Sequence, residues 1–341
     1  MTPEAQPVSD VITRFAPLHL RSGDFFGPPR SSVPGQPQSV SLEPMAPFAD
    51  RLFERIRQTD SRVCLGIDPR PDAHPLTHPE RFGGDPAQVA KAVVYYFQTI
   101  IEATQDVVAC YKLQSAFFEA LGIPGLIALA QLTADVRARG IPVILDGKRG
   151  DVGATAAAYA QAYLAQGVFA SDALTVNPYL GADSLEPFAA QAARAERGLF
   201  VLVKTSNPGS ADLQDTVLEG GGRLYERVAE LVTKLSEPHR GASGYAPVGA
   251  VVGATHPEAL GGLRQRLPYS VLLVPGYGAQ GGGAEDVATA FDADGLGAVV
   301  SSSRALTYTT QEADFAERAR EAAVEMNRAV NAAVNRTLEG R

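Results

Sequence analysis

Eight short runs of aliphatic and β-branched residues recur along the chain from residue 62 onward. They do not alternate with polar residues, which is typical of strands that are buried on both faces. The runs lie at 62–67, 106–112, 142–146, 173–176, 199–204, 247–252, 270–274 and 297–300. The segments between them have a helical period. Asp85 and Pro86 supply an N-cap and a first-turn proline for one helix, and Asp183, with Glu186 three residues later, predicts the start of another.

Eight strands that alternate with helices favour one closed parallel barrel over two doubly wound sheets. A doubly wound sheet normally carries a G-x-G-x-x-G turn after its first strand, whereas this chain has GIDPRPD there. We therefore predict a chain of class α/β in which residues 45–341 form one (β/α)8 barrel, the TIM-barrel fold.

Residues 1–44 differ in composition from the rest of the chain. They hold eight of its 24 prolines and show no sustained helical or strand period. Such a segment buries too little apolar surface to offset the loss of chain entropy on folding. We expect a disordered, proline-rich extension of unknown role, and Met45 is a candidate for the natural start.

Composition narrows the class of protein. The 30 basic and 38 acidic residues leave a net charge of −8, which argues against a nucleic-acid-binding protein. The only cysteines, Cys64 and Cys110, lie in apolar runs and are expected to be buried free thiols. The longest uncharged window, 152–171, is too polar for a membrane span, and no secretory signal is visible. A soluble cytoplasmic protein is the expectation.

Polar residues follow nearly every predicted strand, where a parallel barrel carries its active site. They include Asp68, Lys112, Asp146, Lys148, Asp151, Asn177, Lys204, Ser206 and Arg304. Lys112, Asp146, Lys148 and Asp151 can alternate in sign, which would keep each ammonium protonated between carboxylates. A structural salt-bridge network is the alternative, but the placement at two neighbouring strand ends favours a functional site.

A phosphate site is predicted beside this cluster. The glycines of PGYGAQGGG let backbone N–H groups approach an anion, Gln280 adds a donor, and Arg304 follows the eighth strand. Taken alone, the glycines would indicate only a flexible turn. Four histidines show no metal-binding spacing, so we predict surface or loop histidines and no metal site. They are His74, His78, His239 and His256.

Several segments resemble orotidine 5′-phosphate decarboxylases, and more closely their bacterial group-2 branch. The matching pieces are LGIDPRPD, YKLQSAFFEALG, VILDGKRGDVGATAAAYA, DALTVNPYLGADSLEPF, VLVKTSNPGSADLQD, VPGYGAQGG and SSSRAL. The resemblance implies decarboxylation of orotidine 5′-phosphate to UMP and CO2, the last step of de novo UMP synthesis, without a cofactor. Leu113 and Val152 depart from the proline and isoleucine that we expect there.

The resemblance also implies a role for each site residue. Lys148 resembles the lysine that protonates the carbanion, flanked by Asp146 and Asp151, with Lys112 completing the network. Asp151 and Thr155 are expected to reach the active site of the other subunit of a homodimer. The expected substrate-binding residues are Asp68 for the ribose, with Lys112, then Ser206 for the pyrimidine, Gln280 and Arg304 for the phosphate, and Pro275.

Two other functions remain open. A sister barrel, such as a metal-dependent sugar-phosphate decarboxylase or hexulose-phosphate synthase, also carries D-x-K-x-x-D, but we expect an acidic metal ligand there in place of Lys112. A non-catalytic barrel would bind UMP without turnover.

Overall fold

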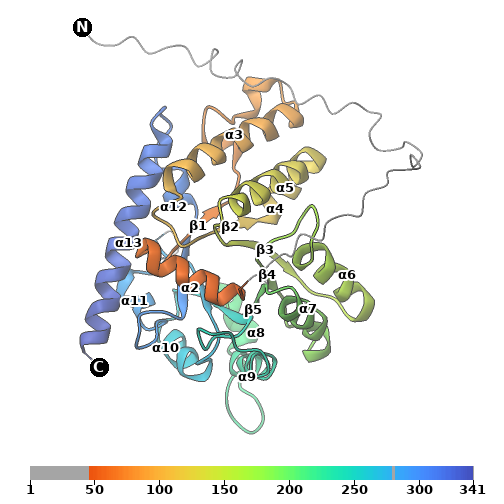
Figure 1. Ribbon diagram of the computed structural model, residues 1–341, viewed down its shortest axis with the longest axis vertical. Helices are drawn as coiled ribbons and strands as arrows, with labels where there is room; N and C mark the ends of the chain where they lie inside the picture. The colour runs from red at the N-terminus through yellow and green to blue at the C-terminus, as the bar shows by residue number, and fades with distance from the viewer. Residues whose placement is uncertain (1–45, 279–280, 341) are drawn as a thin grey trace, which may run out of the picture. The chain divides into compact units, whose positions relative to one another are not determined.

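Eight parallel strands close into one barrel, in chain order from β1 to β8, in a computed structural model that describes residues 46–278 and 281–340 (Figure 1). The strands are β1 (Val63–Ile67), β2 (Cys110–Gln114), β3 (Val143–Arg149), β4 (Ala173–Val176), β5 (Gly198–Lys204), β6 (Val248–Val252), β7 (Leu272–Pro275) and β8 (Ala298–Ser302). The barrel closes where β8 pairs with β1. The predicted (β/α)8 barrel is confirmed, with a strand in each of the eight predicted runs.

Helices connect the strands and pack around them. They are α2 (Phe48–Thr59), α3 (Pro86–Thr104), α4 (Ser115–Glu119), α5 (Gly122–Ala138), α6 (Gly153–Leu164), α7 (Ala182–Arg194), α8 (Ala211–Gln214), α9 (Leu224–Ser236), α10 (Pro257–Arg266), α11 (Ala284–Ala288), α12 (Arg304–Thr307) and α13 (Phe315–Glu339). The carboxylate of Asp85 accepts a hydrogen bond from the Ala87 backbone N–H, so the predicted cap of α3 is confirmed. The predicted cap of α7 is wrong. Gly181, at a φ of 94° that glycine adopts without strain, is the N-cap, and Asp183 lies in the first turn.

Two strand boundaries differ from the prediction in ways that matter for the site. β2 starts at Cys110, because the chain still turns after α3, where Val107 N–H donates to the carbonyl of Thr104. β3 continues to Arg149 instead of ending at Asp146. Lys112 therefore lies in the middle of β2, and Asp146 and Lys148 are both strand residues.

The barrel interior is apolar, and α2 covers one end of it (Figure 1). Phe48 of α2 packs edge-on against Phe200 of β5, with ring centroids 5.8 Å apart. Cys64 and Cys110 are register partners on β1 and β2, and both are fully buried free thiols, as predicted. The amino ends of the strands face α2, so a polar site is expected at the carboxyl ends.

A buried carboxylate links α2 to the barrel. Asp172, directly before β4, is 2% exposed, and it pairs with Arg51 of α2 at 3.1 Å and with Arg197 ahead of β5. Its second oxygen accepts a hydrogen bond from the Val143 backbone N–H at 3.1 Å. One acidic side chain thus joins α2 to β3, β4 and β5.

No helix among the described residues is long and apolar enough to cross a membrane. The predictions for residues 1–44, disorder and a start at Met45, fall outside the described residues.

Candidate active site

Lys112 and Lys148 converge on the carboxylate of Asp146 at the carboxyl end of β2 and β3. The Nζ atom of Lys112 lies 3.0 Å from Asp146 Oδ2, and Lys148 Nζ lies 2.6 Å from Oδ1. The ladder pairs Gln114 of β2 with Asp146 of β3, so the buried side chains of Lys112 and Asp146 enter the site from neighbouring strands. The Lys148 side chain is 45% exposed, whereas those of Lys112 and Asp146 are buried. Lys148 is therefore the member of this trio that is most open to a ligand.

Two uncharged residues complete the shell of Asp146. Gln114 Nε2 donates to Oδ2 at 3.0 Å, and Thr175 Oγ1 donates to Oδ1 at 2.9 Å. Each carboxylate oxygen thus accepts two hydrogen bonds, which uses the roughly four acceptor positions of a carboxylate. The carboxylate of Asp146 therefore has no acceptor position left for a ligand.

The charges of this cluster are fixed. Burial by itself would raise the pKa of Asp146, but the ammonium groups of Lys112 and Lys148 outweigh it and hold the pKa well below its ordinary value. Burial by itself would lower the pKa of Lys112, but the carboxylates of Asp146 and Asp68 outweigh it and raise the pKa above the ordinary value. Lys112 and Asp146 are therefore charged at neutral pH.

The backbone of Lys148 has an unusual conformation for a strand residue. Its φ is 44°, in the left-handed region that costs a non-glycine residue about 1–2 kcal/mol. The residue lies in an irregularity of the β3–β4 ladder, between the pairs Leu145↔Leu174 and Arg149↔Val176. A backbone held in such a conformation needs support from its surroundings.

Asp68 directly follows β1 and faces the same end of the barrel. Its charge contributes to the raised pKa of Lys112. Its Oδ1 atom is buried and has no hydrogen-bond partner among the described residues. A buried acceptor without a partner is costly, so this oxygen suits a hydroxyl donor on a ligand.

Asp151 does not join the cluster within one chain. Its Oδ1 accepts a hydrogen bond from the backbone N–H of its neighbour Val152 at 2.8 Å, and it has no ion pair in the part of the chain that the structure describes. Thr155, near the start of α6, is exposed. One chain therefore assembles three of the four predicted catalytic residues.

The loop after β5 is held firmly. Lys204 is 2% exposed and pairs with Asp215 at 2.8 Å, so it supports the loop instead of facing a ligand. Ser206 is half-buried beyond it, and its carbonyl accepts a hydrogen bond from Thr255 Oγ1 at 3.3 Å. This contact fixes the backbone of Ser206.

The structure describes only part of the predicted phosphate site. Pro275 ends β7 and Arg304 begins α12, while Gln280 lies outside the described residues. Arg304 is exposed and has no ion pair within residues 46–278 and 281–340. It lines a cavity of about 590 Å³ together with Arg70, Tyr308 and Phe117. An unpaired guanidinium on a cavity wall is suited to an anion.

A model of the orotidine 5′-phosphate decarboxylase / HUMPS family matches residues 61–321. The chain belongs to this family. It is 47% identical over 283 residues to the orotidine 5′-phosphate decarboxylase of Rhodopirellula baltica, covering 81% of this chain and 93% of that protein. Identity to the Deinococcus radiodurans protein of the same name is 48% over 263 residues, covering 76% and 89%. The solved structure of Leishmania donovani OMP decarboxylase is 37% identical, with a TM-score of 0.67 and coverage of 85% and 99%.

The sequence did not single out two residues of this decarboxylase-family site, Gln114 and Thr175. A signal for Gln114 exists, because it lies two residues after Lys112 in a strand and so shares its face. Thr175 is the one polar residue in the run ALTV, and it could have been noticed as such. What the sequence could not provide is the bulge in β3 that turns Asp146 and Lys148 toward Thr175.

The histidines do not form a metal site in the described residues, where no group of three His, Cys, Asp or Glu side chains could hold an ion. His74 lies in the loop after β1, as predicted, but its side chain is not at the surface. This side chain is 2% exposed and packs against the rings of Tyr96 and Phe315 at 4.9 and 5.2 Å. It is buried because the loop after β1 folds beneath the start of α13.

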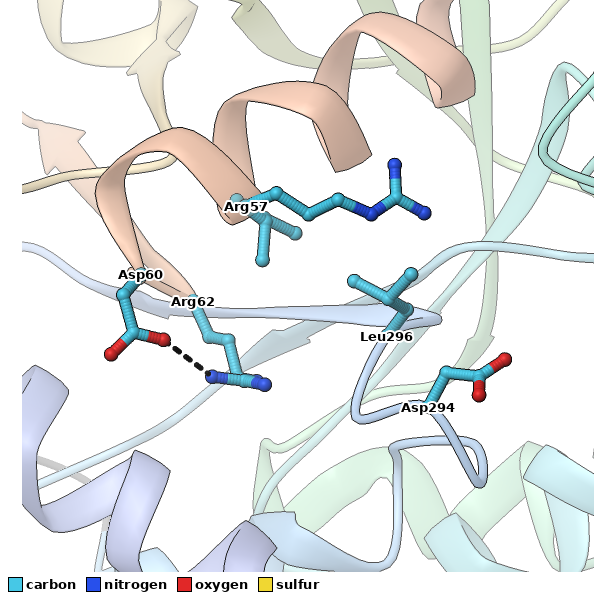
Figure 2. Close-up of a pocket in the computed structure, with 6 residues that line it drawn as sticks. Arg57, Asp60, Arg62, Asp294 and Leu296 are labelled. Carbon is cyan, nitrogen blue, oxygen red and sulfur yellow. Dashed lines mark ion pairs between the residues drawn. The ribbon is translucent and has the colours of Figure 1, made fainter.

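A second cavity, of about 380 Å³, opens at the other end of the barrel (Figure 2). Its lining comes from the end of α2, from the segment that enters β1 and from the loop before β8, and it includes Arg57, Arg62 and Asp294. Figure 2 shows Arg62 directed toward Asp60, with which it forms an ion pair at 3.8 Å. These residues precede their strands, so this cavity is remote from Lys148.

Proposed function

We propose that the protein decarboxylates orotidine 5′-phosphate to UMP and CO2 without a cofactor, as a carbon–carbon lyase in the last step of de novo UMP synthesis. The observation that carries this proposal is the Lys148 ammonium, half-exposed at the carboxyl end of the barrel and anchored 2.6 Å from Asp146. Membership of the family and the relatives of that name support it.

The chemistry explains why an ammonium is needed. Loss of CO2 breaks the bond between C6 and the carboxylate and leaves the electron pair on C6, orthogonal to the ring π system. A preorganised positive charge beside C6 stabilises that pair directly, because it acts in a site of low dielectric and needs no reorganisation. Lys148 supplies the charge and then transfers one of its protons to C6, which yields UMP. Solvent returns a proton to the lysine.

Asp146 acts through the lysines in this scheme. Its four hydrogen bonds leave no acceptor position for the substrate. We infer that it orients Lys148 and Lys112 and keeps Lys112 protonated. Any repulsion of the substrate carboxylate, a contested ground-state effect, would come from Asp151 of the second subunit more than from the compensated Asp146.

The remaining residues are assigned to the rest of the nucleotide. Asp68, with its unpartnered oxygen, and Lys112 bind the ribose hydroxyls. Ser206 contacts the pyrimidine, while Gln280 and Arg304 bind the phosphate and Pro275 lines the site. The phosphate is remote from C6, so its binding energy accelerates the reaction only where it helps to order the site.

A homodimer completes the site in this proposal. Asp151 has no ion pair in its own chain as far as the structure describes it, and Val152, Tyr179 and Leu180 beside it are 48%, 78% and 48% exposed. The loops that carry these residues are joined, because Asn177 N–H donates to the carbonyl of Arg149 at 2.8 Å. Small residues lie exposed along the adjoining face of α6, namely Ala154, Ala157, Ala158 and Ala162. An apolar surface of this kind favours association, which would bring Asp151 and Thr155 to the partner's Lys148.

The finer placement of the protein is also a proposal. The motifs DGKRGD and KTSNPGS support the group-2 branch of the family. We place the catalytic domain at residues 45–341 and the protein in the cytoplasm. The net charge of −8 and the small-molecule site favour a nucleoside monophosphate over nucleic acid as the ligand.

The metal-dependent sister barrels are the main rival. Lys112 lies where we expect their acidic metal ligand, and an ammonium bound to Asp146 at 3.0 Å cannot serve as one. The test supplies orotidine 5′-phosphate in excess EDTA and identifies the products by chromatography. UMP and CO2 in equal amounts support the proposal. UMP binding without turnover would support the non-catalytic barrel, and activity on a sugar phosphate only with added metal would support the rival.

A further inference from the structure

Thr175 is buried at the one place where the backbone of Lys148 and the carboxylate of Asp146 come together. The residue is 1% exposed and lies on β4, next to the irregular part of β3. Its Oγ1 atom accepts a hydrogen bond from the Lys148 backbone N–H at 2.9 Å and donates one to Asp146 Oδ1 at 2.9 Å. A hydroxyl has only one proton, so the direction of both bonds is fixed by their partners.

The irregularity of the ladder explains why this hydroxyl is needed. Between Leu145 and Arg149 the chain of β3 advances four residues, while β4 advances only two, from Leu174 to Val176. The extra residues of such a bulge lose their ladder partners. The N–H of Lys148 is one of these groups, and Thr175 supplies the acceptor that the ladder does not. The same bond supports the left-handed backbone of Lys148, whose φ is 44°.

We propose that Thr175 is a positioning residue for Lys148, and that its hydroxyl aims the ammonium by holding the backbone of Lys148 and the Oδ1 atom of Asp146 in one fixed arrangement. Lys148 Nζ binds the same Oδ1 atom at 2.6 Å. Thr175 therefore contacts the backbone of Lys148 directly and its ammonium through the carboxylate of Asp146. Gln114 is different, because it touches only the other oxygen, Oδ2. The inference rests on the proposed decarboxylation, in which Lys148 must lie beside C6.

The test compares three variants of the full chain. Thr175→Val keeps the shape but removes both hydrogen bonds, and Thr175→Ala removes them without placing a methyl group against the carboxylate. Thr175→Ser keeps the hydroxyl. Thr104→Val is the matched control, because Thr104 is also fully buried and its hydroxyl bonds to the Ile100 carbonyl at 2.7 Å and the Tyr111 hydroxyl at 2.8 Å, in the outer packing between α3 and β2.

The readouts are kcat and KM for orotidine 5′-phosphate, the Kd of UMP and the thermal midpoint. Misplacement of a catalytic group by about 1 Å is expected to lower kcat of Thr175→Val and Thr175→Ala about 100-fold. KM and the Kd of UMP stay unchanged, because the lost contacts serve the transition state. Thr175→Ser restores kcat, and Thr104→Val lowers the thermal midpoint without lowering kcat.

A structural role alone would predict a different pattern. Thr175→Val and Thr175→Ala would then lose thermal stability like Thr104→Val while kcat stayed at the wild-type value, and that result would overturn the inference. Equal impairment of Thr175→Ser and Thr175→Val would overturn it too. A wild-type chain without decarboxylase activity would contradict the proposed function itself, so the two failures are distinguishable.

Discussion

Lys112 and Lys148 bind opposite oxygens of the same carboxylate, at 3.0 and 2.6 Å from Asp146. They reach it from neighbouring strands and differ in exposure, since the Lys112 side chain is 7% and that of Lys148 45% exposed. The ammonium of Lys148 is therefore the more open of the two to the substrate, and that of Lys112 is nearly buried. The predictions that follow test phosphate binding, assembly of the dimer, stability and the role of Lys148.

Arg304→Ala is expected to weaken substrate binding through the phosphate. Loss of a charged hydrogen-bonding partner of a phosphate typically costs about 1.5–3 kcal/mol, so KM for orotidine 5′-phosphate should rise about 10- to 150-fold. The phosphate-free nucleoside orotidine, assayed at high concentration, should react equally well with both enzymes. Steady-state kinetics on the two substrates measures this. An equal loss on orotidine would contradict a role in phosphate binding.

The shared site is tested by mixing two inactive variants. Each hybrid dimer of Lys148→Ala and Asp151→Ala has one site with both residues intact and one with neither. After random exchange of subunits, about a quarter of the wild-type activity should return, because half of the dimers are hybrids with one working site. Native mass spectrometry verifies that hybrids have formed. Hybrids without activity would show that Asp151 does not act across the interface.

The buried carboxylate of Asp172 is expected to matter for stability and not for chemistry. Asp172→Ala leaves Arg197 and Arg51 without their partner, and loss of one member of a buried pair costs about 3–5 kcal/mol. Denaturant unfolding of Asp314→Ala, whose pair with Arg318 is exposed, should differ little from wild type. A midpoint for Asp172→Ala as high as that of Asp314→Ala would contradict the assigned role.

Because His74 is buried, we expect the protein to lose stability in mild acid. Burial lowers the pKa of this imidazole in the folded chain, so below about pH 6.5 the unfolded chain binds a proton that the folded chain does not. The free energy of unfolding should therefore fall as the pH drops through this value. In His74→Gln the fall should be smaller between pH 7 and 5, while the exposed control His239→Gln keeps the wild-type profile. Identical pH profiles for wild type, His74→Gln and His239→Gln would contradict this prediction.

Much of the site could be predicted because strand ends of a parallel barrel meet. Lys112, Asp146 and Lys148 lie on neighbouring strands at one end, as their spacing indicates. Thr175 was missed because its role depends on a bulge, a tertiary feature with no local pattern. The burial of His74 likewise depends on α13, more than 200 residues away in the chain. The N-cap of α7 was predicted wrongly because Gly181, two residues before Asp183, takes that position.

The most direct test of the account is the decarboxylation of orotidine 5′-phosphate by Lys148→Ala in EDTA, followed by the loss of orotate absorbance. The exposed Lys91→Ala is the matched control. We expect metal-free turnover by wild type and by Lys91→Ala. For Lys148→Ala we expect kcat to fall about 100- to 10,000-fold, the usual range for loss of a general acid. Turnover by Lys148→Ala at the wild-type rate would contradict the account.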